Sequence, residues 1–187
     1  MFDLFETLAV LDGVVQNPHL HQARYQHALA SLYPKSAVKL CDFAQLAIPP
    51  AFQTGLVRAR VDYNATAFAV QFFSYQRRTF TQFKPVVCDE IDYAFKFADR
   101  SLLNALYAQR GECDEIIIIK NGLVTDCSIG NLCFLKNGVW YTPKTPLLAG
   151  TQRAKLLVEK RIVLADITPQ ELTDFEQIRV INALNPL

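Results

Sequence analysis

The hydrophobic and polar positions of this chain follow two periods, one typical of strands and one of helices. An alternating run over residues 2–10, followed by Asp12-Gly13, predicts a strand that enters a β-hairpin. A helical pattern then begins at Asn17-Pro18, an N-cap followed by a proline at the first helical position, and stops before Pro34. A shorter helical pattern covers residues 37–47. The first part of the chain therefore combines a strand with helices.

Strands dominate the next part, and strands and helices mix in the second half. Two alternating runs, 56–63 and 66–75, predict strands with one dry face and one face that is wet or lined by a ligand. Four consecutive isoleucines within 115–120 predict a fully buried strand. The other expected elements are helices over 99–110 and 151–160, a short helix capped by Thr168, strands over 84–88 and 177–184, and hairpins at Asn121-Gly122 and Asn137-Gly138. The pattern predicts an α+β protein with lobes at residues 1–86 and 87–187.

Composition excludes several classes of protein. The chain has 187 residues, of which 51% are apolar, so it can bury a core, and its net charge of +1 gives no electrostatic case for a nucleic-acid binder. The five cysteines are odd in number and form no C-x-x-C pair, which predicts free thiols and no metal site. The start lacks a basic segment, and no apolar run approaches the roughly 20 residues of a membrane span. We therefore expect a cytoplasmic protein without membrane contact.

Three positions suggest one kind of chemistry when they are taken together. Lys96 has apolar neighbours, which would lower the pKa of its amine and favour imine formation. Asp126 offers a carboxylate, and Gly150-Thr151 begins a predicted helix whose N–H groups could hold a phosphate. An amine, a carboxylate for a pyridinium and a phosphate site are what pyridoxal phosphate requires. Each has an ordinary alternative: a surface lysine, a turn carboxylate and a simple helix cap.

A series of short motifs runs in order along nearly the whole chain. They are Phe5-Glu6-Thr7-Leu8, His21-x-x-Arg24, Lys96-x-x-x-Arg100, Thr125-Asp126-x-Ser128-x-x-Asn131-Leu132, Tyr141-Thr142-Pro143 followed by Leu148-Ala149-Gly150-Thr151-x-Arg153, and Ile181-Asn182-Ala183-Leu184. Alone, His21 and Arg24 would also fit a surface pair on one helix face. In this order the motifs resemble the class IV aminotransferases, the fold-type IV pyridoxal-phosphate enzymes. These include branched-chain aminotransferase, D-amino-acid aminotransferase and aminodeoxychorismate lyase.

The resemblance implies a fold, a cofactor and a set of site residues. The fold is the two-lobed α+β architecture of D-amino-acid aminotransferase, with the cofactor pyridoxal 5'-phosphate in the cleft between lobes of a homodimer. Lys96 is implied to form the Schiff base and to serve as the base, and Asp126 to bind the pyridine nitrogen. The implied cofactor-binding set is Arg24, Lys96, Asp126, Ser128, Asn131, Thr151, Asn182 and Ala183.

The resemblance leaves the reaction open. It implies an amino acid or amino-carboxylate as substrate, for which Arg58 and Arg60 are candidate carboxylate ligands. The motifs at Lys96 and Ala183 favour the lyase, which releases pyruvate and 4-aminobenzoate, over a transaminase. Asp126 replaces the family's usual glutamate and shortens the reach to the ring by one methylene. This exchange and the short chain support an alternative, a degenerate homologue that keeps the fold as a binding or assembly module. Against that alternative, a half-buried lysine is costly when it has no catalytic role.

Overall fold

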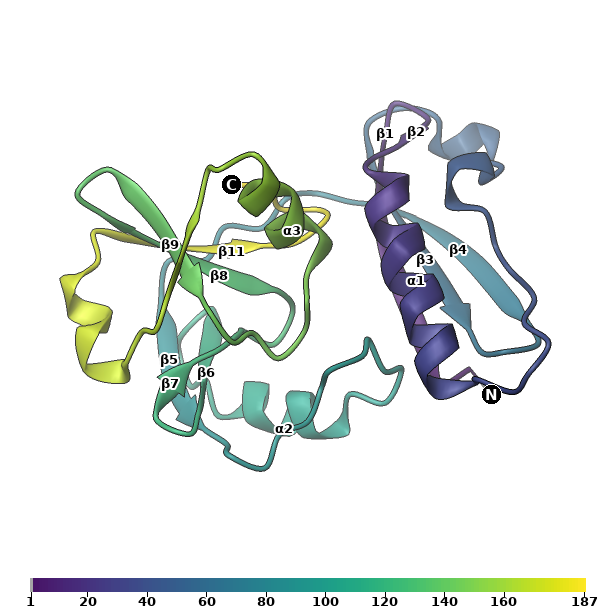
Figure 1. Cartoon of the computed structure of the whole chain (residues 1–187). Coiled ribbons are helices and arrows are strands. Elements are labelled where there is room, and N and C mark those ends of the chain that lie inside the picture. Colours follow the sequence, from purple (N-terminus) through teal and green to yellow (C-terminus); the bar gives the residue numbers. More distant parts are fainter. Residues whose placement is uncertain (1) are drawn as a thin grey trace. The chain divides into compact units, whose positions relative to one another are not determined.

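The chain, seen in a computed structural model that describes residues 2–187, divides into two compact units. The first unit holds the chain up to Arg77 together with Phe95–Asp99. The second holds Arg78–Ala94 and Arg100–Leu187. The two-lobed α+β prediction is confirmed in its class, since both units combine sheet and helix (Figure 1).

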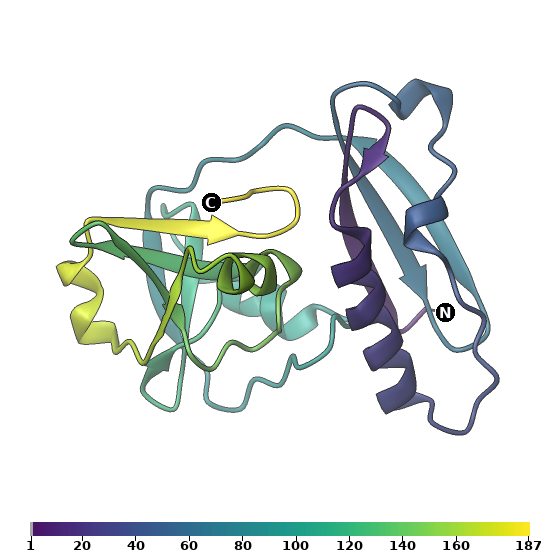
Figure 2. The ribbon, with the colours of Figure 1, turned by 45° about the horizontal axis from the view of Figure 1, so that its top comes forward.

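The first unit is a four-stranded antiparallel sheet in the order β2-β1-β3-β4, with helix α1 (Pro18–Leu32) across one face (Figures 1 and 2). The strands are β1 (Leu4–Leu11), β2 (Val14–Val15), β3 (Leu56–Tyr63) and β4 (Phe68–Ser74). The hairpin between β1 and β2 turns through Asp12 and Gly13, both at positive φ, as a two-residue turn of this kind requires. The hairpin and strand predictions for this region are confirmed.

Strand alternation gives this sheet two unlike faces. Leu4 and Leu8 of β1 point into the core with the buried face of β3, and the core also receives Tyr25 and Leu29 of α1. Glu6 lies between those leucines and is also fully buried. The opposite face carries the arginines of β3, as the alternation predicts. A carboxylate therefore occupies a position where the pattern of the strand calls for an apolar side chain.

The second unit contains two further sheets. One is parallel between β5 (Phe83–Val87) and β6 (Glu115–Lys120) and continues to β7 (Leu123–Val124). The other has the order β10-β9-β8-β11, and its strands are β8 (Asn131–Lys136), β9 (Val139–Pro143), β10 (Val163–Ala165) and β11 (Gln177–Ile181). Helices α2 (Ser101–Ala108) and α3 (Thr151–Val158) complete the unit. The isoleucines of β6 are at most 2% exposed, so the buried-strand prediction is confirmed.

The segment Phe95–Asp99 returns to the first unit because it pairs with the start of β1. Phe5 N–H donates to the Lys96 carbonyl at 3.0 Å, Ala98 N–H donates to the Asp3 carbonyl at 2.8 Å, and Leu4 faces Phe97 in a β-bridge. The ladder from β5 to β6 binds residues 83–87 to the second unit instead. The boundary between the two units therefore lies between residues 77 and 78, whereas it was expected between 86 and 87. Lys96 belongs to the first unit and not, as expected, to the second.

Two local predictions differ from the structure. Residues 37–47 form no α-helix; a single 3₁₀ turn, η1 (Phe43–Gln45), stands there, begun by the Asp42 side chain accepting the N–H of Ala44. The backbone is extended again at Leu46, ahead of the two prolines that follow. Strand β10 was not expected, since only three residues form it. Within residues 2–187, no helix is both long enough and apolar enough to cross a bilayer.

Candidate cofactor-binding site

Lys96 lies half-buried against an aromatic ring that it shares with an arginine. Its Nζ is 4.6 Å from the centroid of the Phe5 ring, and the Cζ of Arg60 is 4.1 Å from the same centroid. A cation near an aromatic ring is attracted by the electron density of the ring face. The backbone bonds between this segment and β1 fix the main chain of the lysine. The main chain at Lys96 is thus fixed, and its amine lies against the Phe5 ring.

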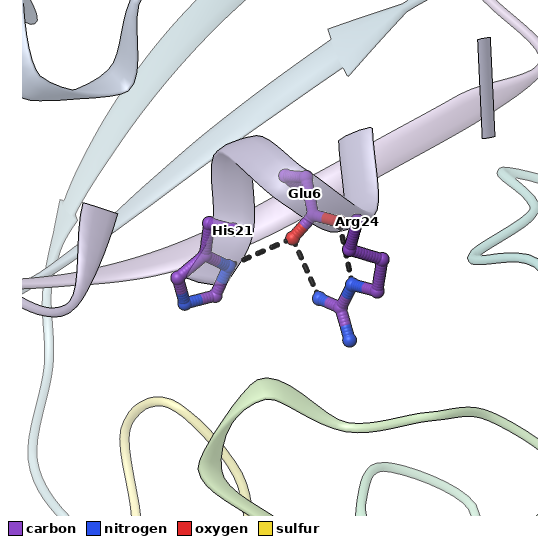
Figure 3. A network of polar contacts seen from close by, with 3 residues as sticks. All are labelled: Glu6, His21 and Arg24. Atoms are coloured by element: carbon purple, nitrogen blue, oxygen red, sulfur yellow. Dashed lines mark hydrogen bonds and ion pairs between the residues drawn. The ribbon is translucent and has the colours of Figure 1, made fainter. Parts of the chain in front are cut away.

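A buried polar network lies in the same unit, between β1 and α1 (Figure 3). Glu6 Oε2 is 2.9 Å from His21 Nδ1 and 2.6 Å from Arg24 Nη2, while Glu6 Oε1 accepts Arg24 Nε–H at 2.8 Å. His21 and Arg24 are one turn apart on α1, so both reach the same carboxylate. Burial opposes ionisation of Glu6, but the charge of Arg24 and the hydrogen bonds of both partners lower its pKa to about 2. His21 and Arg24 therefore form no surface pair.

The two arginines of β3 differ in their partners. Arg60 donates from Nε and Nη2 to Asp62 at 2.9 and 2.6 Å. Arg58 stacks over the ring of Phe73, with its Cζ 4.5 Å from the centroid. Its Nε is buried, and within residues 2–187 it has no hydrogen-bond partner. Of the two substrate candidates, Arg58 is the one whose charge meets no carboxylate in the described chain.

In the second unit, Asp126 is buried and held by two donors. Its Oδ1 accepts the side-chain N–H of Asn131 at 2.7 Å, and its Oδ2 accepts the backbone N–H of Leu148 at 2.9 Å. Burial raises the pKa of Asp126 to about 6, although these donors and the charge of Arg153 oppose the shift. Each carboxylate oxygen can accept more than one hydrogen bond, so the geometry still allows a ligand donor.

Asn131 is fixed between Asp126 and the loop that leads into α3. Its Nδ2 also donates to the Leu148 carbonyl at 2.9 Å. Gly150 lies so close that a Cβ on this residue would overlap Oδ1 of Asn131. The backbone at Gly150 is extended, with φ −72° and ψ 140°, so a glycine is required here by space and not by dihedral angle. Gly150 of one predicted motif therefore makes room for Asn131 of another.

Helix α3 starts directly after this glycine, with Thr151 as its first residue. Its N-cap residue, Gly150, has no side chain with which to cap this end. The first N–H groups of a helix have no intrahelical partner, and the helix dipole adds positive potential there. Arg153 is buried in the first turn; its Nη2 donates to the Pro143 carbonyl at 2.8 Å, and its Nε is without a partner in the described chain. This helix start has the properties of a phosphate site.

The side chain of Ser128 is hydrogen-bonded to a second buried acid, Glu115. Its hydroxyl donates to Glu115 Oε2 at 2.9 Å, and its carbonyl accepts Arg100 Nη2–H at 2.7 Å. Glu115 is 1% exposed, and burial raises its pKa. The side chain of Ser128 thus already has a partner within the protein. Its expected contact with the cofactor stays a prediction.

The Asn182-Ala183 element forms a tight turn after β11. Asn182 Oδ1 accepts the backbone N–H groups of Leu184 and Asn185, each at 3.0 Å, and its Nδ2 donates to the Ile129 carbonyl at 3.3 Å. The Asn182 side chain thus holds the turn together. The predicted cofactor contact of this element would have to come from backbone groups, which includes Ala183.

Three residues of these polar networks have roles that the sequence patterns do not predict. The apolar pattern predicts Glu115 only as the first residue of a buried strand, although an acid directly before four isoleucines is a signal of a buried charge. Leu148 contributes its backbone N–H to Asp126, for which its side chain gives no signal. The motif Phe5-Glu6-Thr7-Leu8 assigns no role to Glu6, although an acid between inward-facing leucines indicates a buried partner.

Comparison with known proteins gives the family. The sequence profile of the amino-transferase class IV family matches residues 96–187. An uncharacterized protein of Haemophilus influenzae Rd is 52% identical over 188 residues and covers both chains fully. A crystal structure of a proposed 4-amino-4-deoxychorismate lyase from Haemophilus somnus 129PT is 46% identical, covers 100% of this chain and 98% of its own, and superposes with a TM-score of 0.91.

This chain belongs to the class IV aminotransferases. The fold prediction is thereby confirmed as fold-type IV. A hypothetical aminotransferase from Mycobacterium tuberculosis, in its PLP-bound form, shares the fold with a TM-score of 0.77 at 16% identity, over 99% of this chain and 78% of its own. The family is one of pyridoxal-phosphate enzymes, and related aminotransferases bind amino-acid substrates.

The residues present fit pyridoxal phosphate. The donor set contains a half-buried amine at Lys96, a buried and oriented carboxylate at Asp126, and the N-terminus of α3 at Thr151. These groups match the aldehyde, the ring nitrogen and the phosphate of the cofactor in chemical type. The first belongs to one compact unit and the other two to the second.

Proposed function

We propose that this class IV aminotransferase is a pyridoxal-phosphate-dependent enzyme that acts on an amino acid or amino-carboxylate. The observation that carries the proposal is the orientation of Asp126, whose two oxygens are fixed by Asn131 and by the N–H of Leu148 beside the start of α3. Buried acids whose pKa is raised are enriched at functional sites, which supports a ligand-binding role for Asp126. Neither the fold of residues 2–187 nor the comparisons favour the alternative of a non-catalytic module.

Each residue has a defined task in this proposal. When bound, pyridoxal phosphate draws electrons away from the amine-bearing carbon of the substrate. Lys96 would hold the aldehyde through Nζ, and its amine would move the proton at that substrate carbon. Asp126 holds a proton on the ring nitrogen. Arg24 and the N–H groups at Thr151 bind the phosphate, together with the Asn182-Ala183 turn.

For the substrate carboxylate, we favour Arg58 over Arg60. Asp62 already accepts two nitrogens of Arg60, which neutralises its charge. Arg58 has a buried Nε without a partner in the described chain, and its ring contact with Phe73 leaves its charge uncompensated. A carboxylate ligand would give Nε of Arg58 a hydrogen-bond acceptor and would balance the charge of its guanidinium.

Among the reactions of the family, we propose 4-amino-4-deoxychorismate lyase as the first to test. The similarity to the Haemophilus somnus protein supports this choice, since it extends over the whole chain at 46% identity. The motifs at Lys96 and Ala183 support it independently. The family alone leads us to propose further that the protein acts as a homodimer in the cytoplasm.

The first experiment is an absorption spectrum of the purified protein with pyridoxal phosphate. We expect a band near the edge of the visible range that is absent in Lys96→Ala and present in Lys84→Ala, an exposed lysine used as the matched control. An added amino acid should shift the band. A wild type without the band, or a band that persists in Lys96→Ala, would refute the proposal.

A second experiment separates the two reactions. The loaded protein is given 4-amino-4-deoxychorismate, and pyruvate and 4-aminobenzoate are measured. Transfer of the amino group to 2-oxoglutarate is measured in parallel with a panel of amino acids. Pyruvate release without a keto-acid acceptor supports the lyase, whereas acceptor-dependent turnover alone assigns a transaminase.

A further inference from the structure

The network between β1 and α1 places a full charge in the interior of the first unit. Glu6 is 0% exposed and lies in the inward row of β1 with Leu4 and Leu8. A buried carboxylate is tolerated only where partners replace the water that it loses. The contacts that compensate Glu6 all come from His21 and Arg24 of α1, so its role concerns these two side chains.

We propose that Glu6 and His21 are positioning residues that hold the Arg24 guanidinium in one orientation for binding the cofactor phosphate. The inference rests on the proposed function, in which Arg24 binds that phosphate. Arg24 meets Glu6 through Nε at 2.8 Å and Nη2 at 2.6 Å, one bond to each carboxylate oxygen. A guanidinium is planar and rigid, so fixing one edge fixes the direction of all its N–H groups.

His21 completes the arrangement from the other side of the carboxylate. Its Nδ1 is 2.9 Å from Glu6 Oε2, the same oxygen that accepts Arg24 Nη2. Burial lowers the pKa of His21, and the charges of Arg24 and Lys96 lower it further against the opposing effect of Glu6. The ring is therefore neutral at pH 7, and an ionised Glu6 requires the proton on Nδ1. His21 thus prevents the carboxylate from rotating without adding charge.

The charges of the network predict whether loss of the Glu6 charge strengthens or weakens phosphate binding. Glu6 and Arg24 together carry no net charge, so Arg24 acts on an anion through directed N–H groups more than through net potential. Replacing Glu6 by glutamine removes the negative charge and also one acceptor site. If charge alone mattered, the phosphate would then bind more tightly. If orientation matters, it binds more weakly.

The experiment compares two ligands that differ only in the phosphate. Pyridoxal phosphate and pyridoxal are titrated against the wild type, Glu6→Gln and His21→Asn, and dissociation constants are read from the absorption band. We expect Glu6→Gln to weaken pyridoxal phosphate about tenfold to a hundredfold, the usual effect of losing a hydrogen bond to a charged group. Pyridoxal should change less than about twofold. His21→Asn keeps a donor near the Nδ1 position and should have the smaller effect.

Asp62→Asn is the matched control, because it removes the charge from a second arginine–carboxylate pair of the first unit, the partly buried pair of Arg60 and Asp62. It should leave the ratio of the two dissociation constants unchanged. Thermal unfolding and circular dichroism establish that each variant is folded, and if Glu6→Gln is not, Glu6→Asp and His21→Leu take its place. Glu6→Asp keeps the charge but cannot span both partners, and His21→Leu removes the second contact.

The outcomes separate this inference from the proposed function. Equal weakening of both ligands, no change, or tighter binding of pyridoxal phosphate in a folded Glu6 or His21 variant overturns the positioning role, while the Lys96-dependent band of the wild type keeps the enzyme proposal intact. Absence of that band in the wild type overturns both. Selective loss of pyridoxal phosphate binding supports the positioning role.

Discussion

Asn131 donates its side-chain amide to Asp126 at 2.7 Å, and the two residues also face each other in an isolated β-bridge. The same amide holds the Leu148 carbonyl, whose residue returns its N–H to the second oxygen of Asp126. Asp126, Asn131 and Leu148 of the loop before α3 are therefore joined in a closed ring of hydrogen bonds. The shorter acid at this position is consistent with such close partners, because a longer side chain would have to displace them.

The contact between Asn131 and Gly150 predicts strong coupling. Gly150→Ala should destabilise the protein by about 2 kcal/mol or more, because the new Cβ must displace the Asn131 amide from Asp126. In an Asn131→Ala background the space is free, and the same change should cost little. Chemical unfolding of the two single variants and the double variant gives the interaction energy. Additive effects would contradict the steric account.

Asp126 should make stability depend on pH in an unusual direction. Its pKa is raised to about 6 from 3.8, so ionisation costs the cofactor-free protein about 3 kcal/mol above pH 6. The cost disappears as the pH falls from 6 to about 3.8, where both states hold the proton. Asp126→Asn should therefore raise the melting temperature at pH 8 but not at pH 4. The surface variant Asp174→Asn, whose partner is Lys136, should show no such difference.

The pKa of His21 should report on Lys96. The charge of Lys96 is one of the contributions that lower this pKa, and Glu6 is the partner that raises it. Lys96→Ala should raise the pKa of His21, and Glu6→Gln should lower it further. Titration of the three histidines by NMR measures both shifts. An unchanged His21 in Lys96→Ala would mean that the two groups do not interact.

Arg58 and Arg60 should respond differently to substitution. Arg58→Gln should raise KM about tenfold or more for the substrate, the size expected for a lost charged hydrogen bond, without changing the Lys96-dependent absorption band. Arg60→Gln should have a smaller effect on KM, because Asp62 already neutralises this arginine. Steady-state kinetics and the spectrum together separate substrate binding from cofactor binding. Equal effects of both variants on KM would refute the preference for Arg58.

Most strands and the three α-helices could be predicted because their signals are local. The turn residues Asp12-Gly13, Asn121-Gly122 and Asn137-Gly138 all adopt the positive φ values that their types allow. The helix expected over 37–47 failed because a side-chain cap and extended residues around η1 outweigh helix propensity. Likewise, Asn17 begins α1 in a left-handed conformation and makes no side-chain cap, so its position was predicted but its mechanism was not.

The motifs indicate candidate site residues, and these stay predictions, but they do not indicate which residues contact one another. Lys96, Asp126 and Asn131 were found from motifs, yet no pattern along the chain indicates that Asn131 reaches Asp126 or that Gly150 makes room for it. The position of Lys96 beside β1 also depends on contacts across more than ninety residues of sequence. Such long-range pairing is decided by the folded chain as a whole, and a local pattern cannot encode it.

The strand contact of Phe95–Asp99 also has a consequence for synthesis. The start of β1 leaves the ribosome first, but its partners, the backbone of Lys96 and Ala98, emerge only after β3 and β4 have been made. The nascent first unit is therefore incomplete until residue 99 is out. A fragment that ends at Arg77 would leave the Phe5 ring without its lysine, and a fragment that starts at Arg78 would carry the lysine without its strand. The Lys96 amine can therefore reach its place against the Phe5 ring only when both pieces are present.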